Sequence, residues 1–207
     1  SSKVKFFSLF FIVFIWVMEL YLPFFTYFDL HWTWQQSLPL NMCDFSRLFL
    51  SFFLLLEEMI LFEVGFFWGI AGALIALFFP DLRYAFPSSE FICFFITHAI
   101  ILIVITYVLV VHPYRPTFKS ALRAAAIGFL MMWVIFFINR LLGQSANFWY
   151  LSDLPNSVVA LKSLVPNPPW HIFIIVLLAI TTFIGIYVLY ELAVFLKKRS
   201  FMWLRSD

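Results

Sequence analysis

The chain has 207 residues, of which 64% are hydrophobic and only 12% are charged, and its formal net charge is +2. With 30 phenylalanines and a mean hydropathy of +1.00, it has too few polar residues to cover a water-soluble surface. The small net charge also excludes the strongly basic character of a nucleic-acid-binding domain, so no nucleic-acid partner is expected. The composition therefore predicts an integral membrane protein.

Six apolar segments approach the length of about 20 helical residues that a hydrocarbon core of roughly 30 Å requires. They are predicted as spans at residues 6–25, 38–56, 61–79, 90–111, 120–142 and 170–196. The polar–apolar alternation of a membrane β-strand is absent from these segments. We predict an all-α, polytopic bundle of six transmembrane helices that forms a single membrane domain over residues 1–207.

The connections between these spans differ in length and character. The first span follows Lys3 and Lys5 as a signal peptide would, but it lacks a small-residue cleavage site and is interpreted as a retained span. The acidic pair Glu57 and Glu58 predicts a short turn, so the second and third spans are expected to form a hairpin. The segment 143–169 is moderately apolar and is expected to pack on the bundle or to lie in the membrane interface.

The basic residues are distributed unequally between the two ends of the predicted bundle. Nine of the 13 lie at the amino end, in the fourth connection and in the carboxyl tail: Lys3, Lys5, Arg115, Lys119, Arg123, Lys197, Lys198, Arg199 and Arg205. The opposite side carries Arg47, Arg83, Arg140 and Lys162. The positive-inside rule then places both termini in the cytoplasm.

Polar residues from separate spans are predicted to lie at one depth on the external side. Cys43 and Asp44 are expected about two turns inside the second span, and His98 about two turns inside the fourth, roughly 8–12 Å below the external face. The other polar groups of that side are Glu19, Asn41, Asn139, Asn147 and Tyr150. This convergence of polar groups in an apolar layer predicts a site, in which Cys43 and His98 face the same interior.

Simpler structural roles compete for several of these residues. Asp44 and Arg47 have the i,i+3 spacing of a pair that neutralises itself on one helix face. Cys93 is interpreted as a small buried hydrophobe, and the row Gly65, Gly69 and Ala73 as a close packing seam. The four histidines and two cysteines lack zinc-site spacing, so neither a metal nor another cofactor is expected.

A series of short motifs gives the chain a family resemblance. In order, they are Leu38-Pro39-Leu40-Asn41-Met42-Cys43-Asp44, Phe67-Trp68-Gly69-Ile70-Ala71-Gly72-Ala73 with Pro80-Asp81, Thr97-His98, Arg115-Pro116-Thr117, and Asn147-Phe148-Trp149-Tyr150-Leu151 before Pro155. Together they resemble the YwaF-type family of bacterial membrane proteins, which is related to the animal transmembrane protein 164. The chain departs from that pattern at Asn41, where a histidine is usual, and at Phe148-Trp149-Tyr150, where Tyr-Met-Tyr is usual.

The resemblance implies a six-helix protein of lipid metabolism in a bacterial cytoplasmic membrane. Animal relatives are described as acyltransferases that move a fatty acyl chain between phospholipids through a cysteine, which carries the nucleophile role to Cys43 and the base role to His98. Acyl transfer also requires donors for an oxyanion. Asn41, Asn139 or Asn147 can supply that donor, and Asp44 or Glu19 can orient the imidazole.

Three functional classes follow from these observations. The first is a cysteine-dependent acyltransferase or lipid ester hydrolase that acts on membrane lipids at the outer leaflet. The second is a non-catalytic membrane subunit or lipid-binding partner of a larger complex, and homo-oligomerisation is left open. The third, a small transporter, is disfavoured because charged residues do not line a path through both leaflets.

Overall fold

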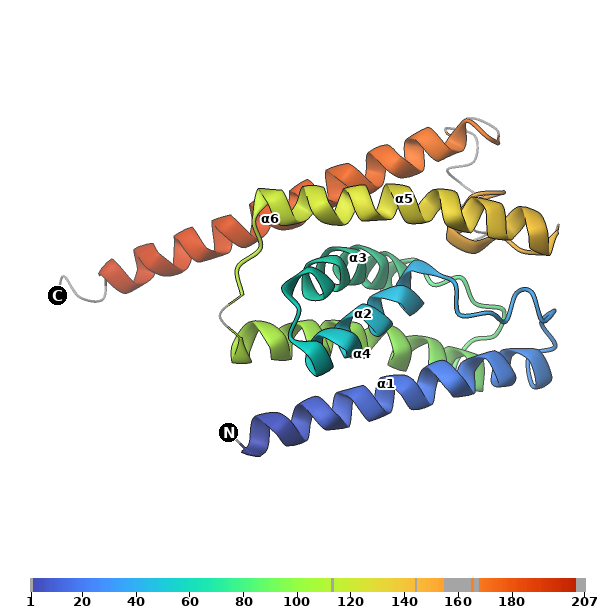
Figure 1. Cartoon of the computed structure of the whole chain (residues 1–207), viewed down its shortest axis with the longest axis horizontal. Coiled ribbons are helices and arrows are strands. Elements are labelled where there is room, and N and C mark those ends of the chain that lie inside the picture. The colour runs from blue at the N-terminus through green and yellow to red at the C-terminus, as the bar shows by residue number, and fades with distance from the viewer. Residues whose placement is uncertain (1, 113, 144, 155–164, 166–167, 204–207) are drawn as a thin grey trace.

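The computed structural model describes residues 2–112, 114–143, 145–154, 165 and 168–203, which are helical without β-strands (Figure 1). The helices are α1 (Ser2–Phe28), α2 (Met42–Leu56), α3 (Met59–Phe78), α4 (Ser89–Val111), α5 (Phe118–Leu142), the short 3₁₀ helix η1 (Phe148–Tyr150) and α6 (His171–Trp203). Each of the six predicted spans overlaps one α-helix. The prediction of an all-α membrane bundle is therefore confirmed.

Helix α2 is shorter than the span predicted for it. It has 15 residues, about 22 Å at 1.5 Å per residue, and the other five α-helices are long and apolar enough to cross a membrane. Helix α2 begins at Met42 because Asn41 has an extended backbone (φ −77°, ψ 159°) and donates its N–H to the Asp44 carboxylate over 2.7 Å. A complete crossing of the membrane by 38–56 stays a prediction.

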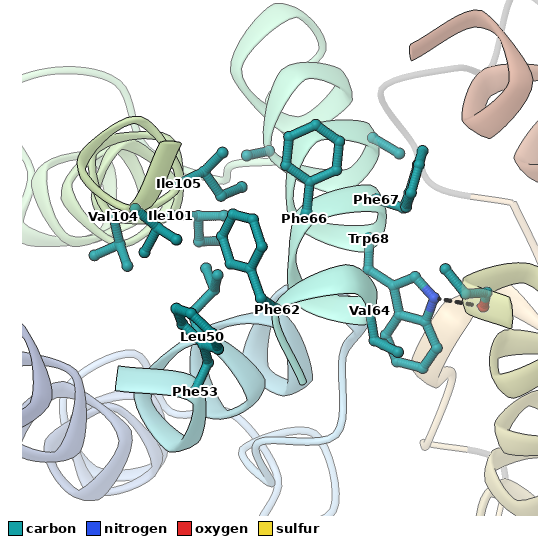
Figure 2. Packing of buried hydrophobic residues seen from close by; sticks show 14 of the residues in the cluster. Leu50, Phe53, Phe62, Val64, Phe66, Phe67, Trp68, Ile101, Val104 and Ile105 are labelled. Atoms are coloured by element: carbon teal, nitrogen blue, oxygen red, sulfur yellow. Dashed lines mark hydrogen bonds between the residues drawn. The ribbon is translucent and has the colours of Figure 1, made fainter. Parts of the chain in front are cut away.

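Helix α3 forms the centre of the bundle, with α2, α4, α5 and α6 packed around it (Figure 1). Its aromatic side chains Phe62, Phe66, Phe67 and Trp68 are buried, and Figure 2 shows Phe62 beside Leu50 of α2 and Ile101 of α4, with Trp68 on the other side of α3. The indole N–H of Trp68 donates to the Ala124 carbonyl of α5 over 3.0 Å, as the dashed line in Figure 2 marks. Helix α3 thus positions the helices on either side of it.

Helix α1 begins and α6 ends at the same end of the bundle, which we call the terminal end (Figure 1). The opposite end, which we call the loop end, holds the α1–α2 and α3–α4 connections and η1. The predicted hairpin is confirmed: α2 and α3 pack together across a two-residue turn in which Glu57 has φ 56°. The start of α1 and the end of α6 lie at the same end, which agrees with an even number of membrane crossings. A cytoplasmic location of that end stays a prediction.

The segment after α5 folds back onto the bundle. Ala146, Phe148 and Leu151 are buried, which confirms the predicted packing for the described part of 143–169. Residues 155–164 and 166–167, including Lys162 of the predicted external side, and Arg205 of the tail lie outside the described residues.

Candidate functional site

Glycines of α3 bring Cys43 into direct contact with the bundle centre. A Cβ atom built on Gly65 would lie 2.9 Å from Leu50 Cγ, and one built on Gly72 would lie 2.9 Å from Cys43 Sγ. Gly72 follows Gly65 by seven residues on α3, and Cys43 precedes Leu50 by seven residues on α2, as expected for two antiparallel helices in contact along this length. The Cys43 side chain lies in this close seam, where only a hydrogen atom at Gly72 leaves it room.

The same glycine row places His98 at the level of Cys43. A Cβ on Gly69 would lie 2.6 Å from Ile101 Cγ2 and 3.0 Å from Ile105 Cδ1, so α4 packs on the opposite side of this row. Because α4 is antiparallel to α3, the residue three positions after Gly69, which is Gly72, lies level with the residue three positions before Ile101, which is His98. The three α4 residues also share one helix face. The helix register therefore brings His98 level with the seam that holds Cys43.

The site lies below the loop end of the bundle, although for a different reason than predicted. Cys43 is in the first turn of α2, not two turns inside it. However, its partner Gly72 lies six residues before the end of α3 at Phe78, about 9 Å at the rise of an α-helix. His98 lies nine residues into α4, about 14 Å. Helix α2 therefore begins inside the bundle, and its first turn carries Cys43 at depth.

The imidazole of His98 is oriented by its own helix. Its Nδ1 atom lies 2.7 Å from the Phe94 carbonyl, and the Phe94 ring lies 4.2 Å from the imidazole, centroid to centroid. A carbonyl oxygen only accepts hydrogen bonds, so Nδ1 carries the proton and Nε2 presents its lone pair. Within the described residues Nε2 makes no hydrogen bond, and neither Asp44 nor Glu19 hydrogen bonds to the ring.

The first turn of α2 offers backbone donors beside the thiol. The N–H groups of Asp44 and Phe45 donate to the Asn41 carbonyl. Those of Met42 and Cys43 donate to no acceptor in the part of the chain that the structure describes. Unpaired N–H groups at a helix start attract negative charge. The two donors belong to Cys43 itself and to the residue before it.

The charged residues near the site form a buried ion network. Arg47 donates from Nε to Glu19 of α1 and from Nη2 to Asp44 Oδ1, the latter over 2.6 Å. Arg47 is 2% exposed and Glu19 is 6% exposed. The predicted Asp44–Arg47 pair is therefore confirmed, and Glu19 is its second partner. This network joins α1 to α2 one turn below Cys43.

Two asparagines predicted as oxyanion donors bind the backbone of η1 and of the turn after it. Asn139 donates to the Phe148 carbonyl over 2.9 Å and accepts from the Phe148 N–H over 3.1 Å. Asn147 accepts from the N–H groups of Ser152 and Asp153 and donates to the Asp153 carbonyl. Both amide groups thus hold η1 and the turn after it, and their role as oxyanion donors stays a prediction.

Helix η1 brings two aromatic residues to the loop end of the site. Trp149 and Tyr150 have left-handed φ values of 58° and 54°, a conformation that costs a non-glycine residue on the order of 1 kcal/mol. The Trp149 indole donates to the Leu40 carbonyl over 2.9 Å, and the buried His171 donates from Nε2 to the Tyr150 carbonyl over 3.0 Å. These contacts fix η1 against the segment that leads into α2.

Tyr150 also interacts with the site electrostatically. Burial, and to a smaller extent the negative charges of Asp81 and of an ionised Cys43, raise its pKa to about 12. The residue as a whole keeps 40% of its surface exposed. The phenol therefore stays protonated at neutral pH and can donate a hydrogen bond at the loop end of the site.

The structure thus brings Cys43 and His98 to one level, with Tyr150 nearby, and assigns other contacts to the remaining candidates. Cys43 and His98 form no hydrogen bond with each other in the described residues, and both cysteines are free thiols. Sequence reasoning missed the Phe94 carbonyl and the unpaired N–H groups of α2. The signal for the first was that Phe94 precedes His98 by four residues on one helix, and the signal for the second was the capping residue Asn41.

Comparisons with known proteins agree with this architecture. The sequence profile of the TMEM164 family matches residues 1–188. An uncharacterized protein of Treponema pallidum (strain Nichols) is 27% identical over 128 residues, which cover 61% of this chain and 52% of that protein, so the match spans about half of its length. No solved structure matches the chain. With a profile match over most of its length, this membrane protein belongs to the TMEM164 family.

Proposed function

We propose that this protein transfers or hydrolyses ester-linked acyl chains of membrane lipids, with Cys43 as the nucleophile and His98 as the base. The observation that carries the proposal is the helix register, which brings Cys43, Gly72 and His98 to one level inside an apolar bundle. The free Nε2 of His98 supports it, because a base must present a lone pair to the thiol.

The first chemical step follows from these roles. His98 Nε2 takes the thiol proton while Cys43 Sγ attacks the carbonyl carbon of the lipid ester. The backbone N–H groups of Met42 and Cys43 stabilise the oxyanion, and the Tyr150 phenol is a third candidate donor. When the intermediate collapses, the ester C–O bond breaks, an acyl thioester remains on Sγ, and the imidazolium returns its proton to the leaving alcohol.

The second step determines whether the reaction is a transfer or a hydrolysis. A hydroxyl of a lysolipid or a water molecule gives its proton to His98 and attacks the thioester, and the Cys43 thiol is restored. The depth of the site supports a lipid substrate, because about 9 Å below the end of α3 is a level at which acyl chains and ester groups meet.

Labelling of the thiol tests the assignment directly. Purified protein is treated with a fatty-chain chloroacetamide, and the label on each cysteine is followed by mass spectrometry. We expect Cys43 to react faster than Cys93, and His98→Ala to slow labelling of Cys43 by about a hundredfold, the contribution typical of a positioned base. Cys93→Ser is the matched control and leaves the rate at Cys43 unchanged. Equal rates at both cysteines, unaffected by His98→Ala, contradict the proposal.

A second candidate function is a non-catalytic, lipid-binding membrane subunit. The observation that favours it is the contact of Sγ with Gly72, because a thiol in such a seam also serves as packing. The two functions differ in their effect on cellular lipids. Catalysis predicts an altered lipid profile when Cys43→Ala protein is expressed at wild-type level, whereas a subunit role predicts an unchanged profile.

We also propose that the protein lies in a bacterial cytoplasmic membrane with both termini inside. The bacterial relative supports the location, and the nine basic residues at the terminal end and tail support the orientation. In this orientation the proposed reaction takes place in the outer leaflet.

A further inference from the structure

A buried cation lies next to the proposed nucleophile. Arg47 follows Cys43 by four residues on α2, so the two side chains share one helix face and their Cβ atoms lie about 5–6 Å apart. The guanidinium of Arg47 reaches back toward the start of α2, because Nη2 donates over 2.6 Å to Asp44, the residue after Cys43. A positive charge therefore lies at the level of the thiol, in a part of the bundle that excludes water.

Two carboxylates share this one guanidinium. Asp44 accepts from Nη2 of Arg47, and Glu19 of α1 accepts from Nε. Glu19 is buried and Asp44 is 15% exposed. Within the described residues, the second carboxylate oxygen of Glu19, Oε2, is buried and makes no hydrogen bond. The charge of Glu19 is therefore only partly compensated and acts on the groups around it.

Helix register brings Glu19 to the depth of His98. Phe11 of α1 packs edge-on against Tyr107 of α4, with 5.1 Å between the ring centroids. Helices α1 and α4 run in opposite directions (Figure 1). Glu19 follows Phe11 by eight residues, and Ala99, the neighbour of His98, precedes Tyr107 by eight residues. The network on α1 and α2 thus lies at the same level as the proposed base on α4.

The network interacts electrostatically with both proposed catalytic groups. Arg47 and Asp44 act on the Cys43 thiol and on the His98 imidazole, and Glu19 acts on the thiol. Helix α3 presents the uncharged Gly72 to the thiol, and the loop end presents the neutral phenol of Tyr150. Charges interact more strongly in an apolar interior than in water. The ionic state of the thiol therefore depends chiefly on Arg47 and on its two carboxylate partners.

We propose that Arg47 stabilises the thiolate that forms on Cys43, and that Glu19 limits this stabilisation by compensating the charge of Arg47. The proposal rests on the proposed function for the role of Cys43 as nucleophile. In the first step the thiol proton moves to His98 Nε2, and the electron pair left on sulfur attacks the ester carbonyl carbon. Arg47 exchanges no proton and touches no reacting atom, so it is a positioning residue.

Alkylation of the purified full chain by iodoacetamide tests this role, because only the thiolate reacts and its amount is read from rates between about pH 6 and pH 10. Glu19→Gln keeps an acceptor for Arg47 Nε but removes the negative charge. We expect it to speed labelling of Cys43 about tenfold at neutral pH, since a nearby charge shifts ionisation by about one pH unit or more. For the same reason we expect Arg47→Gln to slow labelling about tenfold, and Arg47→Lys to retain most of the rate.

Opposite effects of the two substitutions separate this role from a purely structural one. A network that only held α1 against α2 would loosen in both variants and expose the thiol, so labelling would become faster in both. Glu63→Gln is the matched control, because Glu63 is a buried carboxylate paired with Arg123 and lies nine residues from Gly72 on α3, about 14 Å away. We expect it to leave the rate at Cys43 unchanged. Faster labelling in both network variants, no change in either, or an equal effect of Glu63→Gln overturns the proposal.

A double variant keeps the test decisive if Arg47→Gln does not fold, since that substitution leaves two carboxylates without their cation. Glu19→Gln/Arg47→Gln removes both partners of the interhelical pair. Compared with Glu19→Gln alone it isolates the charge of Arg47, and we expect labelling about tenfold slower than in Glu19→Gln. Equal rates in these two variants overturn the role of Arg47. If His98→Ala leaves the rate unchanged while the network variants act in opposite directions, the proposed base is wrong and the role of Arg47 stands.

Discussion

Gly72 is the residue on which the surroundings of Cys43 depend most directly. Gly72→Ala adds a methyl group 2.9 Å from Sγ, where an atom must move. We expect overpacking of about 1–3 kcal/mol, partly offset by the roughly 1 kcal/mol by which alanine exceeds glycine in a helix. The free energy of unfolding of purified protein in micelles measures the net loss, and alkylation of Cys43 reports the displaced thiol.

A double-mutant cycle isolates this contact. In a Cys43→Ala background the sulfur is absent, so we expect Gly72→Ala to cause no loss of stability. Gly185→Ala on α6 is the control, because a Cβ there meets nothing within 4 Å. If Gly72→Ala destabilises both backgrounds equally, the contact between Gly72 and Cys43 is not what limits the seam.

At the scale of single residues, sequence spacing predicted contacts within one helix but not those between helices. Asp44 and Arg47 were paired from their i,i+3 spacing, and the structure confirms the pair. The bond from Arg47 to Glu19 joins residues 28 positions apart and depends on how α1 packs against α2. No local pattern encodes that choice of partner.

At the scale of elements, η1 owes its position to Asn139 of α5. Asn139→Ala removes both hydrogen bonds to the Phe148 backbone, at about 1 kcal/mol each. We expect faster amide hydrogen exchange at Phe148 and Trp149, with the helices themselves protected as before. Hydrogen exchange followed by mass spectrometry measures this change.

Asn147→Ala is the comparison for this prediction. Its side chain holds only the turn at Ser152 and Asp153, so we expect exchange to increase there while Phe148 stays protected. Unchanged protection at Phe148 in Asn139→Ala would show that Trp149 and His171 are sufficient to hold η1.

Helix boundaries show where sequence reasoning succeeds at this scale. Apolar runs predicted six helices, and five of them are long and apolar enough in the structure to cross a membrane, because hydrophobic length is a local property. The start of α2 was placed four residues too early, at residue 38, because Leu40 is as apolar as the helix that follows it. The polar Asn41–Asp44 cap, and not hydropathy, determines this boundary. The contact of Asn139 with Phe148 was likewise not predicted, since tertiary packing determines that partner.

At the scale of the whole molecule, the orientation in the membrane is testable with single cysteines. In a Cys43→Ser/Cys93→Ser background, we expect Ser152→Cys to react with an impermeant maleimide in intact cells. We expect Ser2→Cys to react only after permeabilisation, because the basic residues favour a cytoplasmic terminal end. Both positions are exposed in the structure. The reverse pattern would move the proposed reaction to the cytoplasmic leaflet.

The short α2 also has a consequence for how the chain enters the membrane during synthesis. A segment of 15 helical residues that contains Asp44 and Arg47 is a weak insertion signal by itself. The two-residue turn joins it to the strongly apolar α3, so the pair can partition into the bilayer together as one hairpin. Glu19 is already present on α1 when Arg47 arrives. Biosynthetic insertion of α2 is therefore coupled to the helices on both sides of it.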